Sequence, residues 1–341
     1  MRFLKYFSIF ALIIFGIYYI SQHTGDAYVK LTGQTMGTYY NIKIHTGRDK
    51  TIIDKAVREE LAQVNGEMSV FDKNSEISRI NQAPAGEWVE LSPAMAYLLK
   101  DAAKIYRQSN GYFDPTVGKL VDLWGFGVSE VKHVPDDAAI KAALKDVGFN
   151  QLVFSSNGRK VKKNNSETYL NLSAIAKGYG VDRIAKLLEK MEFHDFVVEI
   201  GGEVRAKGRR DSNTNGWNIG VVAPNSEGTG KNAYVVTLKN YSVATSGDYR
   251  NYFYIGDKRY SHTISPHNGR PVQHNLASVT VFAPNSMDAD AYATAIMAMG
   301  EKKGLKFAND NKLAVIMFAH NKDGSFDSIV SDEGRKFIGE N

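Results

Sequence analysis

The sequence predicts an α+β protein in which helices come first, strands fill the middle, and a helix and a strand close the chain. Two observations favour this class over a doubly wound parallel sheet. Helical and strand patterns do not alternate regularly, and the strand patterns in the middle of the chain follow one another without a helical pattern between them. The composition, 43% apolar and 23% charged, is that of a globular chain, and 341 residues allow one large unit or two fused smaller ones.

The first residues are predicted to form a membrane signal or anchor. Arg2 and Lys5 precede an almost unbroken apolar run over residues 6–20, and positive charge keeps its own end in the cytoplasm. The run is short for a membrane span, but its cleavage pattern is poor, so an uncleaved anchor and a cleaved signal both stay open. We assign residues 1–24 to this segment and residues 25–341 to a domain beyond the membrane.

Five further segments carry apolar residues at the spacing of a helix. In the second segment, Ser92 is placed to cap the first turn, Pro93 suits the first helical position, and Gly111 follows the end. The predicted helices cover residues 52–68, 92–109, 136–147, 176–191 and 288–299.

Strand patterns begin with residues 29–45, a pair that we expect to be broken at Gly33 and Gly37. Residues 152–154 and 168–172 are predicted to be strands on either side of the turn Asn157-Gly158. The remaining predicted strands cover residues 196–200, 217–222, 233–238, 252–255, 277–282 and 313–318.

Cysteine content and charge exclude several functions. The chain has no cysteine, which excludes disulfides, thiolate zinc sites, iron–sulfur clusters, a cysteine nucleophile and the lipid attachment of a bacterial lipoprotein. The net charge is +5, and without Arg2 and Lys5 it is 40 basic against 37 acidic residues, or +3. This excess is too small to indicate nucleic acid as the main partner.

The glycine-rich segment 171–180 is similar to a phosphate-binding turn. A strand is expected to end at Leu172, Ser173 can cap, and a helix begins within a few residues. A helix N-terminus attracts anions, and Lys177 adds a positive charge there. The segment is neither a Walker loop nor a dinucleotide fingerprint, so an ordinary strand–helix connection with a solvated lysine stays open.

Asp290 and Thr294 are four residues apart on a predicted helix and therefore share one face. Their neighbours are small or apolar, so a carboxylate and a hydroxyl on this helix could hold a hard cation such as Mg²⁺. The alternative is that Asp288 and Asp290 only favour the start of the helix electrostatically.

Two other segments could carry chemistry. His262 stands at the end of a predicted strand, and imidazole exchanges protons near neutral pH, although a structural role is more common. Asp114 follows Tyr112 and Phe113 and precedes Pro115, in what reads as a turn after a helix. The two aromatic residues could instead stack on a planar ring.

Taken in order, these segments resemble the ApbE family of FAD:protein FMN transferases, over roughly residue 31 to the C-terminus. The motifs that carry the resemblance are Thr35-Met-Gly-Thr38, Ser75-Glu-Ile-Ser-Arg-Ile-Asn81, Phe113-Asp-Pro-Thr-Val-Gly118, Leu123-Trp-Gly-Phe-Gly127, Leu172-Ser-Ala-Ile-Ala-Lys-Gly178, Glu199-Ile-Gly-Gly-Glu203, Thr245-Ser-Gly-Asp-Tyr-Arg-Asn251, Tyr260-Ser-His-Thr-Ile264 and Ala289-Asp-Ala-Tyr-Ala-Thr-Ala295.

The resemblance implies a magnesium-dependent transferase that splits FAD, releases AMP and joins FMN to a threonine or serine of another protein. It implies FAD bound between two subdomains, and export to the periplasmic side of the bacterial inner membrane. The implied acceptors include flavin-carrying subunits of sodium-pumping quinone reductase and related complexes. A hydrolase that releases FMN and AMP, and a module that only binds FAD, are the competing hypotheses.

The resemblance also implies roles for single residues. Asp290 and Thr294 would bind Mg²⁺ with backbone carbonyls near Ala174 and Ala293, which makes Asp290 catalytic through the metal, and His262 would be the base for the acceptor hydroxyl. The residues implied to contact FAD are Met36, Phe71, Tyr112, Phe113, Asp114, Asn171, Lys177, His262 and Ile264.

The chain departs from the family pattern at three points. Asn171 stands where aspartate is common, Phe71 where tyrosine is common, and Ser265-Pro266 where Asp-Pro is frequent. An amide in place of a carboxylate weakens a hydrogen bond to the nucleotide, and phenylalanine stacks but does not donate. These departures leave FAD binding expected and the balance between transfer and hydrolysis open.

Overall fold

The structure is a computed structural model that describes residues 28–127, 133–224, 233–247, 252–256 and 258–339. The predicted membrane segment, residues 1–24, lies outside the described residues. In the part of the chain that is described, no helix is both long and apolar enough to cross a membrane.

The centre of the fold is an eight-stranded sheet in which every pair of neighbours is antiparallel, so the predicted α+β class is confirmed. The spatial order is β1-β2-β6-β7-β10-β13-β14-β15. These strands are β1 (Tyr28–Thr35), β2 (Thr38–His45), β6 (Phe196–Ile200), β7 (Glu203–Lys207), β10 (Tyr241–Gly247), β13 (Leu276–Ala283), β14 (Ala314–His320) and β15 (Phe326–Val330).

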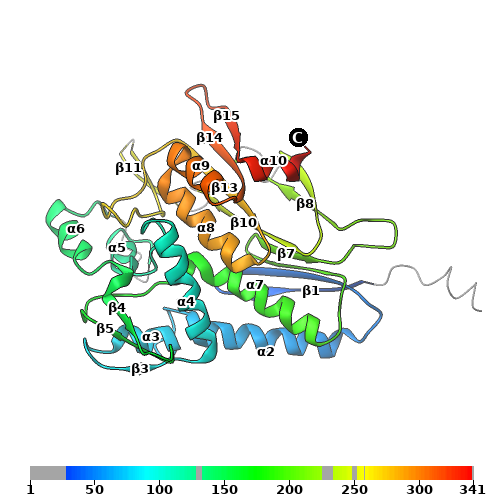
Figure 1. The fold of residues 1–341 in the computed structure, drawn as a ribbon, viewed down its shortest axis with the longest axis horizontal. Helices are drawn as coiled ribbons and strands as arrows, with labels where there is room; N and C mark the ends of the chain where they lie inside the picture. The colour runs from blue at the N-terminus through cyan, green and yellow to red at the C-terminus, as the bar shows by residue number, and fades with distance from the viewer. Residues whose placement is uncertain (1–27, 128–132, 225–232, 248–251, 257, 340–341) are drawn as a thin grey trace, which may run out of the picture.

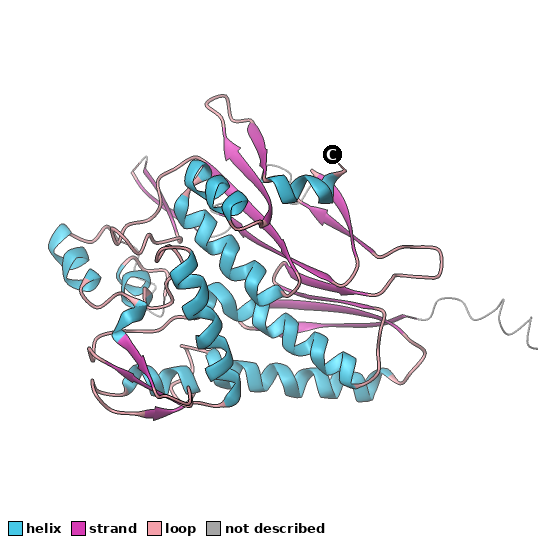
Figure 2. Ribbon diagram, viewed as in Figure 1, coloured by secondary structure: helices cyan, strands magenta, loops and turns pink. Residues whose placement is uncertain are grey.

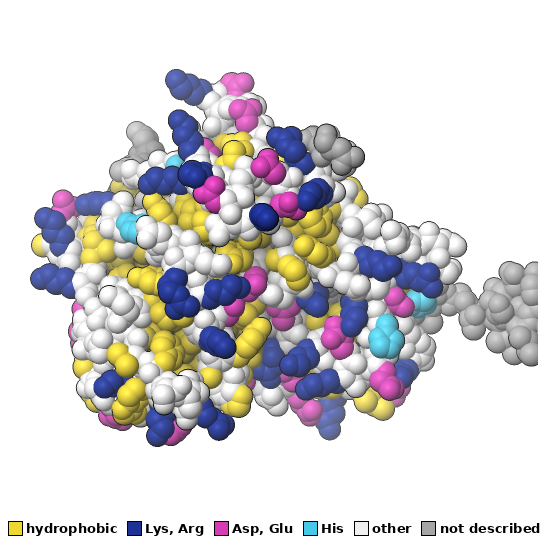
Figure 3. Space-filling model, viewed as in Figure 1, with side chains coloured by type: hydrophobic (Ala, Val, Ile, Leu, Met, Phe, Trp, Pro, Cys, Tyr) yellow, Lys and Arg dark blue, Asp and Glu magenta, His cyan; other side chains and the backbone are white. Residues whose placement is uncertain are grey.

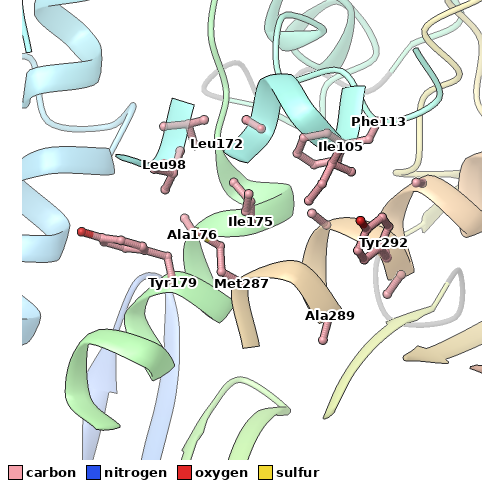
Figure 4. Close-up of a cluster of buried hydrophobic side chains, with 14 of the residues drawn as sticks. Leu98, Ile105, Phe113, Leu172, Ile175, Ala176, Tyr179, Met287, Ala289 and Tyr292 are labelled. Carbon is pink, nitrogen blue, oxygen red and sulfur yellow. The ribbon is translucent and has the colours of Figure 1, made fainter. Parts of the chain in front are cut away.

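Helices cover one face of this sheet (Figures 1 and 2). The long helices there are α2 (Lys50–Met68), α4 (Pro93–Gln108), α7 (Ser173–Lys190), α8 (Ser286–Met299) and the shorter α9 (Glu301–Asp310). Apolar side chains of α4, α7 and α8 meet in a core that includes Leu98, Ile175 and Met287 (Figure 4). α8 is buried around most of its circumference because it lies between the sheet and the other helices.

The opposite face of the sheet carries a two-stranded ribbon, β8 (Trp217–Val221) with β9 (Tyr234–Leu238), and helix α10 (Asp332–Ile338). Trp217 and Leu238 of the ribbon and Phe337 of α10 pack against strands β7, β10, β13 and β14. The sheet is therefore sandwiched between a helical layer and a smaller second layer.

Smaller elements extend the helical layer. A three-stranded sheet, β3 (Val89–Glu90), β5 (Lys160–Lys163) and β4 (Leu152–Phe154), lies beside α3 (Glu76–Gln82) and below α4 in the view of Figure 1. A separate apolar cluster joins α5 (Gly118–Leu123) and α6 (Asp137–Leu144) to the hairpin β11 (Tyr252–Ile255) and β12 (Lys258–Ser261). On the face in Figure 3, lysine and arginine side chains are spread among acidic ones.

The structure corrects four details of the sequence prediction. Gly33 lies inside β1, so only the turn at Gly37 divides the two strands. Glycine is needed at position 33 because a Cβ atom there would come within 2.6 Å of the Tyr40 ring. The strand that follows β4 is β5, and residues 168–172 form only an isolated bridge at Tyr169. Helix α6 ends at Leu144, three residues before the predicted end. Helix α7 begins three residues before its predicted start.

Candidate functional site

Several predicted site residues lie at one end of the main sheet. At this end β2 begins, β6 ends, β7 begins and β10 ends, because neighbouring strands run in opposite directions. The N–H group of Gly201, in the β6–β7 turn, donates to the carbonyl of Tyr39 near the start of β2 (3.0 Å). A Cβ atom on Gly201 would lie 3.4 Å from Cδ of Lys177, so α7 passes close to the same turn.

Lys177 lies between two buried carboxylates, and we call Lys177, Glu203 and Asp290 the Lys177 cluster. Nζ of Lys177 donates to Oε1 of Glu203 (2.6 Å) and is 3.7 Å from Oδ1 of Asp290. The side chain of Glu203 is 2% exposed, and burial raises its pKa to about 7, although Lys177 lowers it. Among the described residues, nothing donates a hydrogen bond to the buried Oε2 of Glu203. The site thus holds more acidic than basic groups around one cation.

Asp290 is held in place by the backbone of α7. Its Oδ2 accepts a hydrogen bond from the N–H group of Gly178 (2.9 Å), and its side chain is 4% exposed. Residue 178 has to be glycine, because a Cβ atom there would lie 2.3 Å from the carbonyl oxygen of Ser286 and 2.8 Å from Cβ of Asp290. Asp290 therefore does more than favour the start of its helix.

A carboxylate of α7, that of Asp182, fixes the start of α8. Oδ1 of Asp182 accepts from the N–H group of Ser286 (2.9 Å), and Oδ2 accepts from that of Met287 (2.8 Å). Burial raises the pKa of Asp182 to about 6, against the lowering by these two bonds and by Arg205. The first N–H groups of a helix have no acceptors within the helix. The Asp182 carboxylate, on the neighbouring helix, accepts their hydrogen bonds instead.

Thr294 lies one turn after Asp290 on α8, and its Oγ1 is 3.3 Å from Oγ of Ser246 on β10. A buried carboxylate and a hydroxyl on one face of a helix suit a hard cation such as Mg²⁺. In the described part of the chain, no three His, Cys, Asp or Glu side chains gather as a metal site. A cation at Asp290 and Thr294 would therefore complete its shell with backbone carbonyls, water and substrate phosphates.

Two turns meet in front of α7. Oδ1 of Asn171 accepts from the N–H group (3.0 Å) and the hydroxyl (2.6 Å) of Ser173. The N-cap of α7 is Leu172, so the predicted capping by the Ser173 side chain is wrong. The N–H group of Asn171 donates to the carbonyl of Pro115 (2.7 Å). In that second turn, Oδ1 of Asp114 accepts from the N–H group (2.8 Å) and the hydroxyl (2.6 Å) of Thr116. Burial raises the pKa of Asp114 to about 6.

The two aromatic residues before Asp114 lie in different surroundings. Phe113 is 1% exposed and belongs to the core in Figure 4, so its ring is already packed and only its backbone can face a ligand. Tyr112 is half-buried: its ring is 4.4 Å from that of His267, and its hydroxyl accepts from Nζ of Lys303 (2.9 Å).

Four other predicted residues are placed separately. Met36 lies in the β1–β2 turn with φ of 51°, and its sulfur would be 3.2 Å from a Cβ atom on Gly180 of α7. Ile264 is buried in the cluster that joins α5, α6 and the β11–β12 hairpin, and the ring of His262 lies 6.4 Å from that of Phe126. Phe71 is 73% exposed between α2 and α3.

The structure thus brings Lys177 and Asp290 together, with Met36 against the same helix. The FAD contacts and the base role of His262 stay predictions. Glu203 and Asp182 are absent from the predicted site, and Ser246 is a third residue that the prediction omits. Glu203 had a signal, since it directly follows the glycine pair of a motif that the sequence made conspicuous.

Comparison with known proteins decides the family. A family model described as the ApbE family matches residues 36–317. The chain belongs to the ApbE family. This range contains every predicted site residue, from Met36 to Thr294.

Relatives in the ApbE family agree over nearly the whole chain. A protein from Haemophilus influenzae named FAD:protein FMN transferase is 39% identical over 308 residues, which are 87% of this chain and 88% of that one. A Vibrio cholerae protein of the same name is 38% identical over 91% of this chain and 92% of its own length. These relatives are transferases, as the sequence predicted.

Solved ApbE structures share the fold. The flavin transferase ApbE from Vibrio cholerae superimposes with a TM-score of 0.83 and 35% identity over 92% of this chain and 99% of that one. The Pseudomonas stutzeri flavinyl transferase ApbE, in its apo form, gives 0.85 and 32% over 93% and 98%. The predicted ApbE-like fold is therefore confirmed. The N-terminal anchor, the division into two subdomains and the position of FAD stay predictions.

Proposed function

We propose that this chain transfers FMN from FAD to a threonine or serine hydroxyl of an acceptor protein and releases AMP. The names of the ApbE relatives support flavin transfer from FAD to protein. The observation that carries the proposal is the Lys177 cluster, where a cation near the start of α7 meets the oxygen donors of α8. Phosphoryl transfer depends on positioning and charge neutralisation, and this arrangement offers both.

Mg²⁺ is the metal that the donor set fits, held by Asp290 and Thr294 with the backbone carbonyls of Ala174 and Ala293. When bound, it would neutralise the phosphate charge that grows as the pyrophosphate bond breaks. The ammonium group of Lys177 would also neutralise phosphate charge. Glu203 holds that ammonium group at the site by accepting a hydrogen bond from it. Gly178 holds the Asp290 carboxylate in a fixed orientation.

The nucleotide would lie along the two turns in front of α7. Met36, Tyr112, Asp114 and Asn171 are proposed to contact FAD there, with Phe113 contributing backbone. The His262–Ile264 segment and Phe71 are proposed to complete the contacts. Because Oδ1 of Asn171 already accepts two hydrogen bonds from Ser173, its amide NH₂ group is the part left to bind the nucleotide.

The proposed transfer of FMN needs one base, which takes the proton of the acceptor hydroxyl. The acceptor hydroxyl oxygen forms a bond to the FMN phosphorus, and the bond from that phosphorus to the bridging oxygen breaks. AMP leaves with the electron pair of that bond. His262 accepts the hydroxyl proton, because a threonine or serine hydroxyl is a poor nucleophile while it keeps its proton.

We also propose where the reaction takes place. The charged and apolar order of residues 1–24 supports export, with the domain on the periplasmic side of the inner membrane. Flavin-carrying subunits of a sodium-pumping quinone reductase or a related electron-transfer complex are the proposed acceptors.

The test is co-expression of the full-length chain with such a subunit, followed by mass spectrometry of the subunit. We expect one added FMN on a threonine or serine. An unmodified subunit together with free FMN and AMP would instead indicate hydrolysis and overturn the proposal. Asp290→Ala should abolish the mass increase. Asp310→Ala, at the exposed end of α9 in a pair with Lys306, is the matched control that should keep it.

A further inference from the structure

A groove of about 400 Å³ lies on the face of the main sheet away from α7 and α8. Its floor consists of alternate residues of neighbouring strands, such as Asn41 and Lys43 of β2, Val197 and Glu199 of β6, and Thr245 of β10. Alternate residues of a strand lie on the same face of a sheet, because successive side chains point to opposite sides.

The wall of the groove differs from the floor, because it contains consecutive residues. It consists of every residue of β8, from Trp217 to Val221, and of Val222. A consecutive run of this kind belongs to a strand edge rather than to one face of a strand. Among the described residues, β8 pairs only with β9, so its other edge has backbone N–H and C=O groups without a strand partner. An edge of this kind can accept one more strand.

The groove reaches the functional site through two points in the sheet. Gly202 lines the groove. Its neighbour Gly201 lies against Lys177, and its other neighbour, Glu203, accepts a hydrogen bond from Lys177. Similarly, Thr245 lines the groove, and the next residue, Ser246, contacts Thr294 on the other side. The groove therefore ends at the two-glycine turn behind which the Lys177 cluster lies.

The lining of the groove suits an extended segment that carries both polar and apolar side chains. Glu199 accepts hydrogen bonds from the hydroxyl of Tyr39 and the amide of Asn41 (3.0 Å each), and the hydroxyls of Thr245 and Thr280 are 2.9 Å apart. The lining also includes Gly202, Gly220, a charge of each sign and apolar side chains such as that of Trp217, so an extended segment with both polar and apolar side chains fits it.

We propose that this groove binds the acceptor protein: an extended segment of the acceptor pairs with the open edge of β8. Its threonine or serine then passes over the Gly201–Gly202 turn to the Lys177 cluster. This inference rests on the proposed function and adds the surface that selects the protein substrate. Backbone pairing would supply affinity, and the floor, with its polar and apolar side chains, would select the side chains of the segment.

The absence of cysteine from the chain allows a direct test, because an engineered cysteine is the only thiol. Asn218→Cys places it on β8 in the groove, and Val235→Cys places it on β9, 61% exposed and outside the groove. Each variant of the full-length chain is compared with and without a bulky maleimide–polyethylene glycol label. The probe acceptor is a purified flavin-carrying subunit of a sodium-pumping quinone reductase, and FAD affinity is followed by flavin fluorescence.

We expect the label on Asn218→Cys to lower kcat/KM for the acceptor by about tenfold or more, because it blocks backbone pairing with β8, without changing FAD affinity. The label on Val235→Cys should change neither quantity. Equal transfer by labelled and unlabelled Asn218→Cys would overturn the groove while leaving the proposed function intact. Failure of the unlabelled variants and the parent chain to transfer FMN would overturn both.

Discussion

The contact between α7 and α8 at Gly178 leads to the sharpest prediction about this fold. Gly178→Ala would introduce a Cβ atom 2.3 Å from the carbonyl oxygen of Ser286, 2.7 Å from its carbonyl carbon and 2.8 Å from Cβ of Asp290. Because two of these atoms are backbone, the helices have to move apart. The same movement lengthens the bond from the Gly178 N–H group to Asp290.

The magnitude follows from two opposing effects. Overpacking costs about 1–3 kcal/mol, and we expect the upper half of that range because helix backbones are rigid. Alanine gains about 1 kcal/mol over glycine in a helix, so the net loss of unfolding free energy is about 1–2 kcal/mol. Gly66→Ala is the matched control: Gly66 lies within α2, where an added Cβ atom meets nothing within 4 Å, and stability should rise by up to about 1 kcal/mol.

Urea unfolding, followed by circular dichroism, measures both variants against the parent chain. The two glycine substitutions should change the unfolding free energy in opposite directions, and only Gly178→Ala should slow FMN transfer. If Gly178→Ala were as stable as Gly66→Ala, the close packing of α7 on α8 would be wrong.

Three further predictions concern single side chains. Asp290→Ala should reduce kcat for FMN transfer far more than FAD affinity, and excess chelator should have the same effect on the parent chain, because a metal stabilises charge that grows in the transition state. His262→Ala should bind FAD and Mg²⁺ but transfer FMN about 10²–10⁴-fold more slowly, with a smaller loss at higher pH where hydroxide replaces the base. Asp114→Asn should remove a pH dependence of stability. The raised pKa of Asp114, about 6 in the fold, means that the folded chain binds the proton more tightly than the unfolded chain, so the parent loses stability relative to the variant as pH rises from about 4 to about 6.

Each of these has a contradicting result. A loss confined to KM in Asp290→Ala, or transfer that persists in excess chelator, would refute the metal role. Near-normal transfer by His262→Ala at neutral pH would rule out the base. A constant difference in unfolding free energy between Asp114→Asn and the parent across pH 4–7 would mean that this carboxyl group does not titrate differently in the fold.

Local signals explain what the sequence predicted well. Ser92 does cap α4 through its hydroxyl, and Pro93 occupies the first helical position. The apolar residues at helical spacing in α2 are buried: Ile53, Val57, Leu61, Val64 and Met68. The pair Asp290 and Thr294 follows from helix geometry alone. In each case, residues a few positions apart determine the structure, so a single sequence contains the information.

Errors arise where distant segments decide. Gly33 looked like a break because glycine often ends a strand, whereas here it makes room for the Tyr40 ring across the hairpin. Asp182 reads as an ordinary charged residue, since nothing near it in sequence shows that it binds the start of α8. The glycine pair before Glu203 marks its motif but does not show that its carboxylate is almost fully buried beside Lys177. A carboxylate's burial depends on the whole fold.

The length of β1 separates the point where the chain enters the domain from the functional site. Tyr28 pairs with His45 at one end of the hairpin, and Thr35 pairs with Thr38 at the other, next to the functional site. Eight residues of strand span about 26 Å. If the N-terminus is tethered in a bilayer, the chain enters the domain at the end of the β1–β2 hairpin that is farther from the site, so the site lies about one strand length from the point of entry.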